Sequence, residues 1–262
     1  SNGWPSTTRG AAADPMTPRR RSLPSACMAA AFVALLAGSA TAAGAQSPHL
    51  SPLAGPGDAP SAPWAYAGLP AQTLPATRYG VVTLDGQRVL QVRAERSYGN
   101  LVHRLDAAPA GMLAWRWRVD RPAHGVDLRR KQGDDTALKV CAMFDLPRQA
   151  VPFLERQLMR LAESRTGQAL PNATLCYVWD PSLPQGTLLD NAYTRRVRIV
   201  ALGGAPAQWR AERHDLAADF LRAFGDEAPT APPLLAIAVG ADTDNTGSDT
   251  LGYVAALELL PR

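Results

Sequence analysis

Cysteine and histidine are scarce in this sequence, and several motifs that carry enzyme chemistry are missing. The chain has 3 cysteines and 4 histidines, and the histidines lack the paired spacing of a zinc site. There is no phosphate-binding P-loop, no dinucleotide glycine fingerprint and no Gly-x-Ser-x-Gly elbow. The apolar stretch of residues 26–37 is shorter than the roughly 20 residues that cross a bilayer. The sequence thus argues against zinc enzymes, nucleotide-dependent enzymes and α/β-hydrolases.

The beginning of the chain has the order of a secretory signal peptide. A basic stretch, residues 19–21, precedes the apolar stretch, and Ala43 and Ala45 stand at the −3 and −1 positions of a cleavage site. This order predicts a signal peptide over residues 16–45, preceded by upstream sequence in residues 1–15. We therefore expect a periplasmic protein that has no stable membrane span after processing.

Removal of this segment changes the charge balance. The full chain has 27 Lys+Arg and 23 Asp+Glu, a net charge of +4. Residues 1–45 hold four arginines and one aspartate, so they account for +3 of that charge. The mature chain, which we expect to begin near Gln46, is therefore close to +1. A charge this small gives no electrostatic support to nucleic-acid binding.

The mature chain divides into a short lead-in and one domain. Residues 46–63 are rich in Pro, Ser, Ala and Gly without a hydrophobic period, which predicts a flexible lead-in. Residues 64–262 suit a single domain with a substantial core. Cys141 and Cys176 of this domain lie in strand-like runs. An oxidising compartment allows a disulfide between them, and two small buried side chains are the alternative.

Alternation of apolar residues predicts mainly β structure. Residues 81–92 form the clearest hairpin, around Asp85-Gly86, which suits the positive φ angles of a type I′ turn. In residues 112–120, Trp115 and Trp117 share one face with other apolar residues, which favours core packing over sugar stacking. Similar strands are expected at 137–144, 174–179, 195–202, 208–213, 234–241 and 252–260.

Two helices are expected among the strands. Four apolar residues recur at helical spacing: Val151, Leu154, Leu158 and Leu161. They predict one helix over about 150–165. The second is expected over 216–224, and Asp215 is better explained as its N-cap than as part of a catalytic dyad with His214. Many short strands with two short inserted helices predict a single antiparallel β-sandwich that is jelly-roll-like.

Two acidic loops beside predicted strands form the best candidate for a site. They are Lys131-Gln-Gly-Asp-Asp-Thr136 and Asp242-Thr-Asp-Asn-Thr-Gly247. Carboxylates this close together must stay solvated, meet cations or bind metal, because burying them unpaired is too unfavourable. Since the loops of a sandwich gather at its ends, we expect both to meet in one polar site. The expected ligand-binding residues, which include a tryptophan at a strand end, are Lys131, Asp134, Asp135, Trp179, Asp242, Asp244 and Asn245.

The second loop also resembles the opening of a calcium loop. Its carboxylates alternate, and Gly247 permits a sharp turn. The expected Ca²⁺ ligands are Asp242, Asp244 and Asp249. The loop departs from the EF-hand pattern because Tyr253 stands where the closing glutamate belongs. The alternative is a turn whose Asp and Asn side chains bond their own backbone.

Four motifs in this order resemble a family of exported proteobacterial proteins known as a domain of unknown function, number 3047. The motifs are Leu113-Ala-Trp-Arg-Trp-Arg-Val119, Lys131-Gln-Gly-Asp-Asp-Thr-Ala137, Leu175-Cys-Tyr-Val-Trp179 and Asp242-Thr-Asp-Asn-Thr-Gly247. The resemblance covers nearly all of residues 64–262. It implies a periplasmic β-sandwich, similar in motif style to carbohydrate-binding jelly rolls, and it brings no established catalytic residues.

Three functions remain open at this point. The leading hypothesis is non-catalytic ligand binding, with a carbohydrate, a cell-envelope glycan or another small polar molecule as partner. The first alternative is a glycan hydrolase or lyase that uses a pair of carboxylates such as Asp135 with Asp244. The second alternative is a structural envelope protein that binds another protein through its loops. Catalytic residues are not assigned by the sequence.

Overall fold

The computed structural model describes residues 49–69, 72–166 and 170–262. The predicted signal peptide and the sequence before it, residues 1–45, lie outside the described residues. None of the helices in the described ranges is long and apolar enough to cross a membrane.

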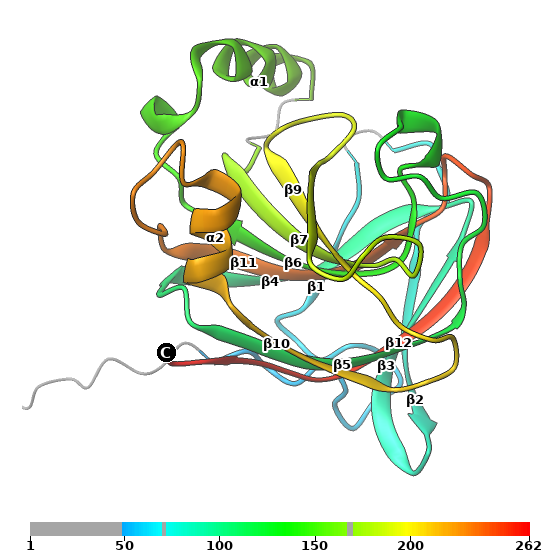
Figure 1. Ribbon diagram of the computed structural model, residues 1–262. Coiled ribbons are helices and arrows are strands. Elements are labelled where there is room, and N and C mark those ends of the chain that lie inside the picture. The colour runs from blue at the N-terminus through cyan, green and yellow to red at the C-terminus, as the bar shows by residue number, and fades with distance from the viewer. Residues whose placement is uncertain (1–48, 70–71, 167–169) are drawn as a thin grey trace, which may run out of the picture. The chain divides into compact units, whose positions relative to one another are not determined.

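Two β-sheets pack face to face around the core (Figure 1). Sheet A has seven strands in the order β1-β4-β11-β6-β7-β9-β8, and sheet B has five in the order β10-β5-β12-β3-β2. The strands of sheet A are β1 (Ala65–Ala67), β4 (Tyr98–Ala108), β6 (Thr136–Phe144), β7 (Ala173–Trp179), β8 (Thr187–Asp190), β9 (Val197–Leu202) and β11 (Leu234–Asp242). The strands of sheet B are β2 (Arg78–Leu84), β3 (Gln87–Glu95), β5 (Met112–Arg121), β10 (Arg210–Asp215) and β12 (Asp249–Leu260). The prediction of a mainly β sandwich is confirmed.

Local patterns explain the best-predicted strands. Asp85 and Gly86 have φ angles of 51° and 75°, so they form the turn between β2 and β3 that the sequence predicts. In β5, Trp115 and Trp117 are at most 1% exposed, so their expected place in the core is confirmed. A fully buried strand face of this size supplies much of the hydrophobic stabilisation of the fold.

Two features of sheet A differ from the expectation. β7 and β9 are parallel, because the chain crosses to the edge strand β8 and returns between β8 and β7. β4 has no counterpart among the predicted strands, because its inward positions include Gly99 and His103, which interrupt the apolar alternation. His103 is nonetheless buried, and its Nε2 atom accepts a hydrogen bond from the backbone N–H of Ser51 at 3.2 Å.

The prediction of a flexible lead-in is wrong for residues 50–63. This segment has no helix or strand, but Leu50 and Leu53 are 4% and 5% exposed and belong to the main core. Trp64 donates its indole N–H to the carbonyl of Ser51 at 2.8 Å. The few apolar residues of the segment are buried against the sandwich. This burial orders the segment despite its Pro- and Gly-rich composition.

Both helices form near their predicted positions. They are α1 (Phe153–Thr166) and α2 (Leu216–Phe224). The predicted cap of α2 is confirmed, since a carboxylate oxygen of Asp215 accepts the backbone N–H groups of Ala217 and Ala218 at 3.0 and 3.1 Å. Two short 3₁₀ turns, η1 (Lys131–Gly133) and η2 (Arg148–Ala150), precede β6 and α1.

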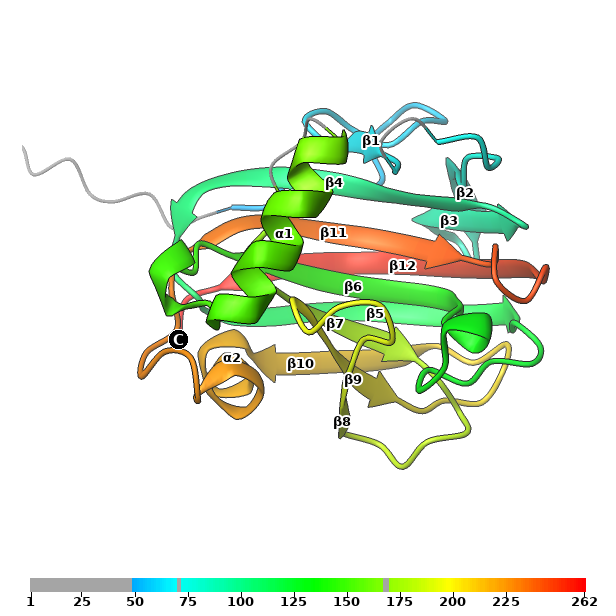
Figure 2. The ribbon, with the colours of Figure 1, turned by 90° about the horizontal axis from the view of Figure 1, so that it is seen from above.

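α1 lies across the outer face of sheet A (Figure 2). Three of its leucines are turned away from the core. Leu154, Leu158 and Leu161 are 69%, 55% and 48% exposed. The side that faces the protein carries the buried Met159 together with charged side chains, of which Glu163 pairs with Arg148. The helical spacing was thus predicted correctly, but the spacing alone does not tell which side is buried.

Cys141 and Cys176 are joined in a disulfide. They face each other directly in the register of β6 and β7. Both are at most 6% exposed, and they belong to a small apolar cluster separate from the main core. Of the two alternatives that the sequence leaves open, the structure has the disulfide.

Candidate functional site

The two acidic loops meet at one end of sheet A. η1 leads into β6, the second loop follows β11, and these two strands are neighbours in the sheet. Thr136 at the start of β6 is paired with Asp242 at the end of β11. The expectation that the loops converge is therefore confirmed, and long-range strand pairing is the cause.

Asp135 ties the two loops together. It is 1% exposed. Its carboxylate accepts the backbone N–H and the side-chain amide of Asn245, both at 3.2 Å, and the backbone N–H and hydroxyl of Thr246, both at 2.6 Å. This geometry gives Asp135 a structural role, and it does not support the hypotheses that Asp135 binds ligand or pairs with Asp244 in hydrolysis. Its oxygens are buried and already bonded.

Asp242 and Lys139 form a buried ion pair at the floor of the site. Lys139 Nζ lies 2.7 Å from Asp242 Oδ2, and the backbone N–H of Thr136 donates to Oδ1 at 3.0 Å. Burial alone lowers the pKa of Lys139, but the carboxylate of Asp242 outweighs this and holds the pKa above its ordinary value. The negative charge of Asp242 is therefore largely neutralised from within the protein.

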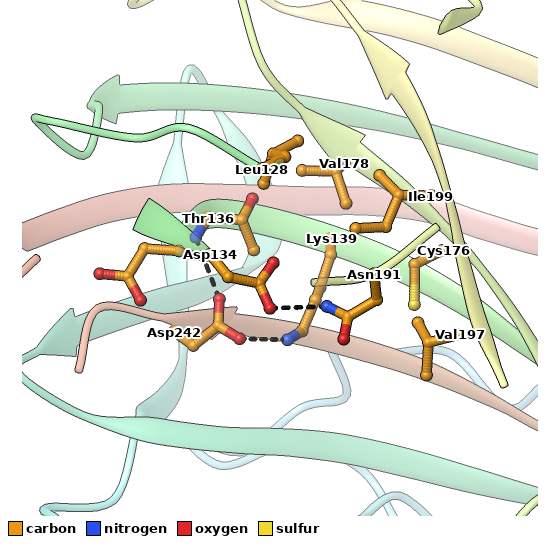
Figure 3. Close-up of a pocket in the computed structure, with 11 residues that line it drawn as sticks. Leu128, Asp134, Thr136, Lys139, Cys176, Val178, Asn191, Val197, Ile199 and Asp242 are labelled. Carbon is orange, nitrogen blue, oxygen red and sulfur yellow. Dashed lines mark hydrogen bonds and ion pairs between the residues drawn. The ribbon is translucent and has the colours of Figure 1, made fainter. Parts of the chain in front are cut away.

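Asp134 lies at a cavity of about 50 Å³ beside this pair (Figure 3). Its Oδ2 atom accepts the side-chain amide of Asn191 at 2.6 Å. In the described part of the chain no salt bridge reaches it. Burial, together with the nearby charges of Asp242 and Asp135, raises the pKa of Asp134 to about 6, although the bond from Asn191 opposes the shift. Asp134 thus combines access to a cavity with a carboxyl group that can hold a proton near neutral pH.

Tyr193 and Asn191, in the segment between β8 and β9, complete the site. The Tyr193 ring is 56% exposed, and its hydroxyl donates to Asn245 Oδ1 at 2.8 Å. Lys131 Nζ lies 5.2 Å from the centre of the ring. Neither Asn191 nor Tyr193 was predicted, although an aromatic residue in a polar turn is a signal that could have pointed to the segment.

Asp244 borders the site from the second loop and is half-buried. Burial and the charges of Asp242 and Asp135 raise the pKa of its carboxyl group. No other residue in the described part of the chain donates a hydrogen bond to its carboxylate or forms an ion pair with it. Asp134 and Asp244 are therefore the two carboxylates of the loops that remain available to a ligand.

Trp179 does not belong to the site. It is 6% exposed and packs in the main core. Gly204 passes so close that a Cβ atom there would meet the indole nitrogen at 2.7 Å. The expectation of an exposed ring at the strand end was wrong, because the segment after β9 covers that end.

The proposed calcium ligands do not form a cluster. Asp249 is bonded to Arg121, and Asp242 is bonded to Lys139. Within residues 49–69, 72–166 and 170–262, no group of three or more His, Cys, Asp or Glu side chains is arranged to hold a metal ion. Protein cations thus neutralise two of the three carboxylates that the loop pattern assigned to Ca²⁺, so the arrangement does not support the calcium prediction.

Replacing Asp134 by asparagine is expected to stabilise the protein at pH 8. The raised pKa means that the folded state holds the proton of Asp134 more tightly than the unfolded chain does. The protonated side chain therefore stabilises the fold below pH 3.8, the pKa in the unfolded chain, and this contribution is lost as the pH rises through about 6, the pKa in the folded state. Asparagine mimics the protonated acid, so the gain should vanish near pH 4. Urea unfolding at both pH values measures it, with the exposed Asp106→Asn as control. A less stable Asp134→Asn protein at pH 8 would contradict the assignment.

Comparison with known proteins identifies one family. The sequence model of the family described as "Protein of unknown function (DUF3047)" matches residues 62–258. No curated protein matches the chain.

Solved structures show only weak similarity. The glycoside hydrolase domain of Endo-D from Streptococcus pneumoniae R6 has a TM-score of 0.30 and 11% identity over 75% of this chain, which spans 21% of that chain. A metagenome-derived glycoside hydrolase family 12 endoglucanase has a TM-score of 0.36 and 12% identity, covering 76% of this chain and 96% of its own. Endoglucanase 3 of family GH12 from Trichoderma harzianum has a TM-score of 0.34 and 10% identity, covering 75% of this chain and 99% of its own. Similarities at this level carry no argument about activity.

Proposed function

The chain belongs to the DUF3047 family, whose description names no activity, and we propose from the geometry that it binds a hydroxyl-rich ligand, a saccharide of the cell envelope, at the acidic end of sheet A. The observation that carries the proposal is the convergence of two available carboxylates, Asp134 and Asp244, with the exposed ring of Tyr193. Export to the periplasm, with cleavage between Ala45 and Gln46, is part of the same proposal and rests on the order of residues in the leader.

The residues of the site match the groups that a sugar presents. Carboxylate oxygens accept hydrogen bonds from hydroxyl groups, and the side-chain amide of Asn191 both donates and accepts. The exposed face of Tyr193 offers an apolar surface to the C–H face of a sugar ring. The cavity at Asp134, at about 50 Å³, has room for one or two water-sized groups, so it takes a substituent of the ligand while the ring rests outside.

Asp134→Asn is expected to weaken saccharide binding at least about tenfold at pH 8, where the native side chain is ionised. Hydrogen bonds to charged groups contribute about 1.5–3 kcal/mol, and asparagine loses that charge while keeping its shape. Titration calorimetry with a panel of neutral, amino and acidic oligosaccharides measures the effect. Asp106→Asn, an exposed carboxylate at the far end of β4, is the control and should bind as the native protein does. A native protein that binds none of the panel would overturn the proposal.

Hydrolysis is a second candidate, favoured by one observation. The carboxyl of Asp134, with a pKa of about 6, is suited to a general acid, and Asp244 is the other available carboxylate. The same oligosaccharide panel decides between the two functions when released reducing ends are also measured. Release that Asp134→Asn abolishes would support the enzyme, whereas binding without release supports the non-catalytic function.

A further inference from the structure

A second cavity lies beside the acidic site, between α1 and the segment that joins β8 to β9. Its volume is about 410 Å³, within the range of roughly 300–1,000 Å³ that is usual for ligand pockets. Apolar side chains make up much of its lining: Leu158, Met159, Ala162, Leu170, Pro171 and Val197. This cavity can therefore hold an apolar group many times larger than the one or two water-sized groups that fit beside Asp134.

The two cavities share a wall. Asn191 and Val197 line both of them. Asn191 donates its side-chain amide to Asp134 at 2.6 Å (Figure 3). The same side chain also borders the apolar cavity. Tyr193 also lines the apolar cavity while its hydroxyl is bonded to Asn245 of the acidic end. A single ligand that lies along this wall has a polar part at Asp134 and an apolar part against α1.

Ion pairs engage the charged groups at the second cavity. Glu163 of α1 pairs with Arg148, and Glu155, which lines the cavity together with Arg195 and Arg196, lies 3.6 Å from Arg196. Leu158 is left on the side of the cavity with 55% of its surface exposed, and Leu170 across the cavity is 36% exposed. Apolar surface of this kind is unfavourable in water, and a bound alkyl group would remove it from solvent.

We propose that the cavity between α1 and the β8–β9 segment binds the alkyl chain of an amphiphile whose hydroxyl-rich head occupies the acidic pocket. The ligand class is thus a glycolipid, in place of a free saccharide. The inference rests on the proposed function, since it adds a second subsite to the same site. The main observation in its support is that the apolar cavity shares Asn191 and Val197 with the pocket at Asp134.

Alkyl maltosides test the inference through chain length. Hexyl, octyl and decyl maltoside are titrated into the full chain below their micelle concentrations, with maltose as the chain-free reference. Each buried methylene is expected to strengthen binding about fourfold, so decyl maltoside, which is four methylenes longer, should bind roughly 200-fold more tightly than hexyl maltoside. Affinity that does not depend on chain length would overturn the inference.

Two matched variants of α1 locate the alkyl chain. Leu158→Glu places a charge at the cavity and should abolish the dependence on chain length, whereas Leu154→Glu, on the same helix but outside the cavity, should preserve it. Both leucines are more than half exposed, so both variants are expected to fold, and their melting curves confirm it. Equal loss in both variants would place the chain on the open face of the helix and refute the cavity.

Alkyl phosphocholines of the same lengths separate this inference from the proposed function. If chain-length dependence appears with both heads and Asp134→Asn weakens only the maltosides, both proposals hold. If both series behave alike and Asp134→Asn changes neither, the alkyl subsite stands and the saccharide function fails. If maltose and the maltosides bind equally and Asp134→Asn weakens both, the saccharide function stands and the alkyl subsite fails.

Discussion

Replacing Arg196 by alanine is expected to lower the free energy of unfolding by about 3–5 kcal/mol, because it leaves a buried carboxylate without its main partner. The guanidinium group of Arg196 binds both oxygens of Glu227 at 2.6 and 2.7 Å. Their side chains are only 4% and 2% exposed. Arg196 also donates to the carbonyl of Asn172, so one side chain joins the start of β7, the start of β9 and the segment after α2.

An exposed ion pair supplies the matched control for Arg196. Arg121 pairs with Asp249 across β5 and β12, and their side chains are 46% and 45% exposed. Solvent screens such a pair, so Arg121→Ala should change stability by no more than about 1 kcal/mol. Urea unfolding measures both variants. If the two losses are alike, burial does not strengthen the Arg196 pair and the argument fails.

Loss of the Cys141–Cys176 disulfide is expected to lower stability by about 4 kcal/mol. The bond closes a loop with a sequence separation of 35, and the chain-entropy model relates that length to about this much stabilisation. The double variant with alanine at both positions should unfold at lower urea concentration than the native protein. Reductant should lower the stability of the native protein to a similar level and leave the double variant unchanged.

The disulfide prediction also has a direct chemical test. Both sulfur atoms are buried on the outer side of sheet A, and Cys176 lines the cavity at Asp134. Peptide mapping without reduction should recover Cys141 and Cys176 in one linked fragment from protein isolated from an oxidising compartment. Two free thiols in the unfolded protein would contradict the bond and remove the expected loss of stability.

Features that depend on near neighbours in the chain were predicted well. The turn at Asp85-Gly86, the buried face of Trp115 and Trp117, and the cap at Asp215 all follow from local conformational preferences or from the period of two. These forces act within a few residues, so the sequence displays them directly. The same is true of the spacing that predicts α1.

Features that depend on what the folded chain places nearby were predicted poorly. Leu158 has the spacing of a buried residue but is 55% exposed, because ion pairs hold the opposite side of α1 against the protein. Trp179 was expected to be exposed but is covered by the segment after β9. Leu50 and Leu53 stand in a stretch with the composition of a linker, yet they are buried. In each case the burial or exposure of the side chain depends on residues that are distant in sequence, so no local pattern predicts it.

Asp134 and Asp135 show most clearly which properties follow from the sequence and which follow from the tertiary structure. The sequence by itself determined a mainly β fold and two acidic loops as the candidate site, because strand alternation and charge are properties of the residues themselves. From the sequence, both adjacent aspartates are predicted equally as ligand-binding residues. The pairing of β6 with β11 then placed Asp135 under the second loop, where four hydrogen bonds occupy it, and left Asp134 at a cavity with its pKa raised to about 6. Desolvation and hydrogen-bond geometry separate the two side chains, and both arise only when distant strands come together.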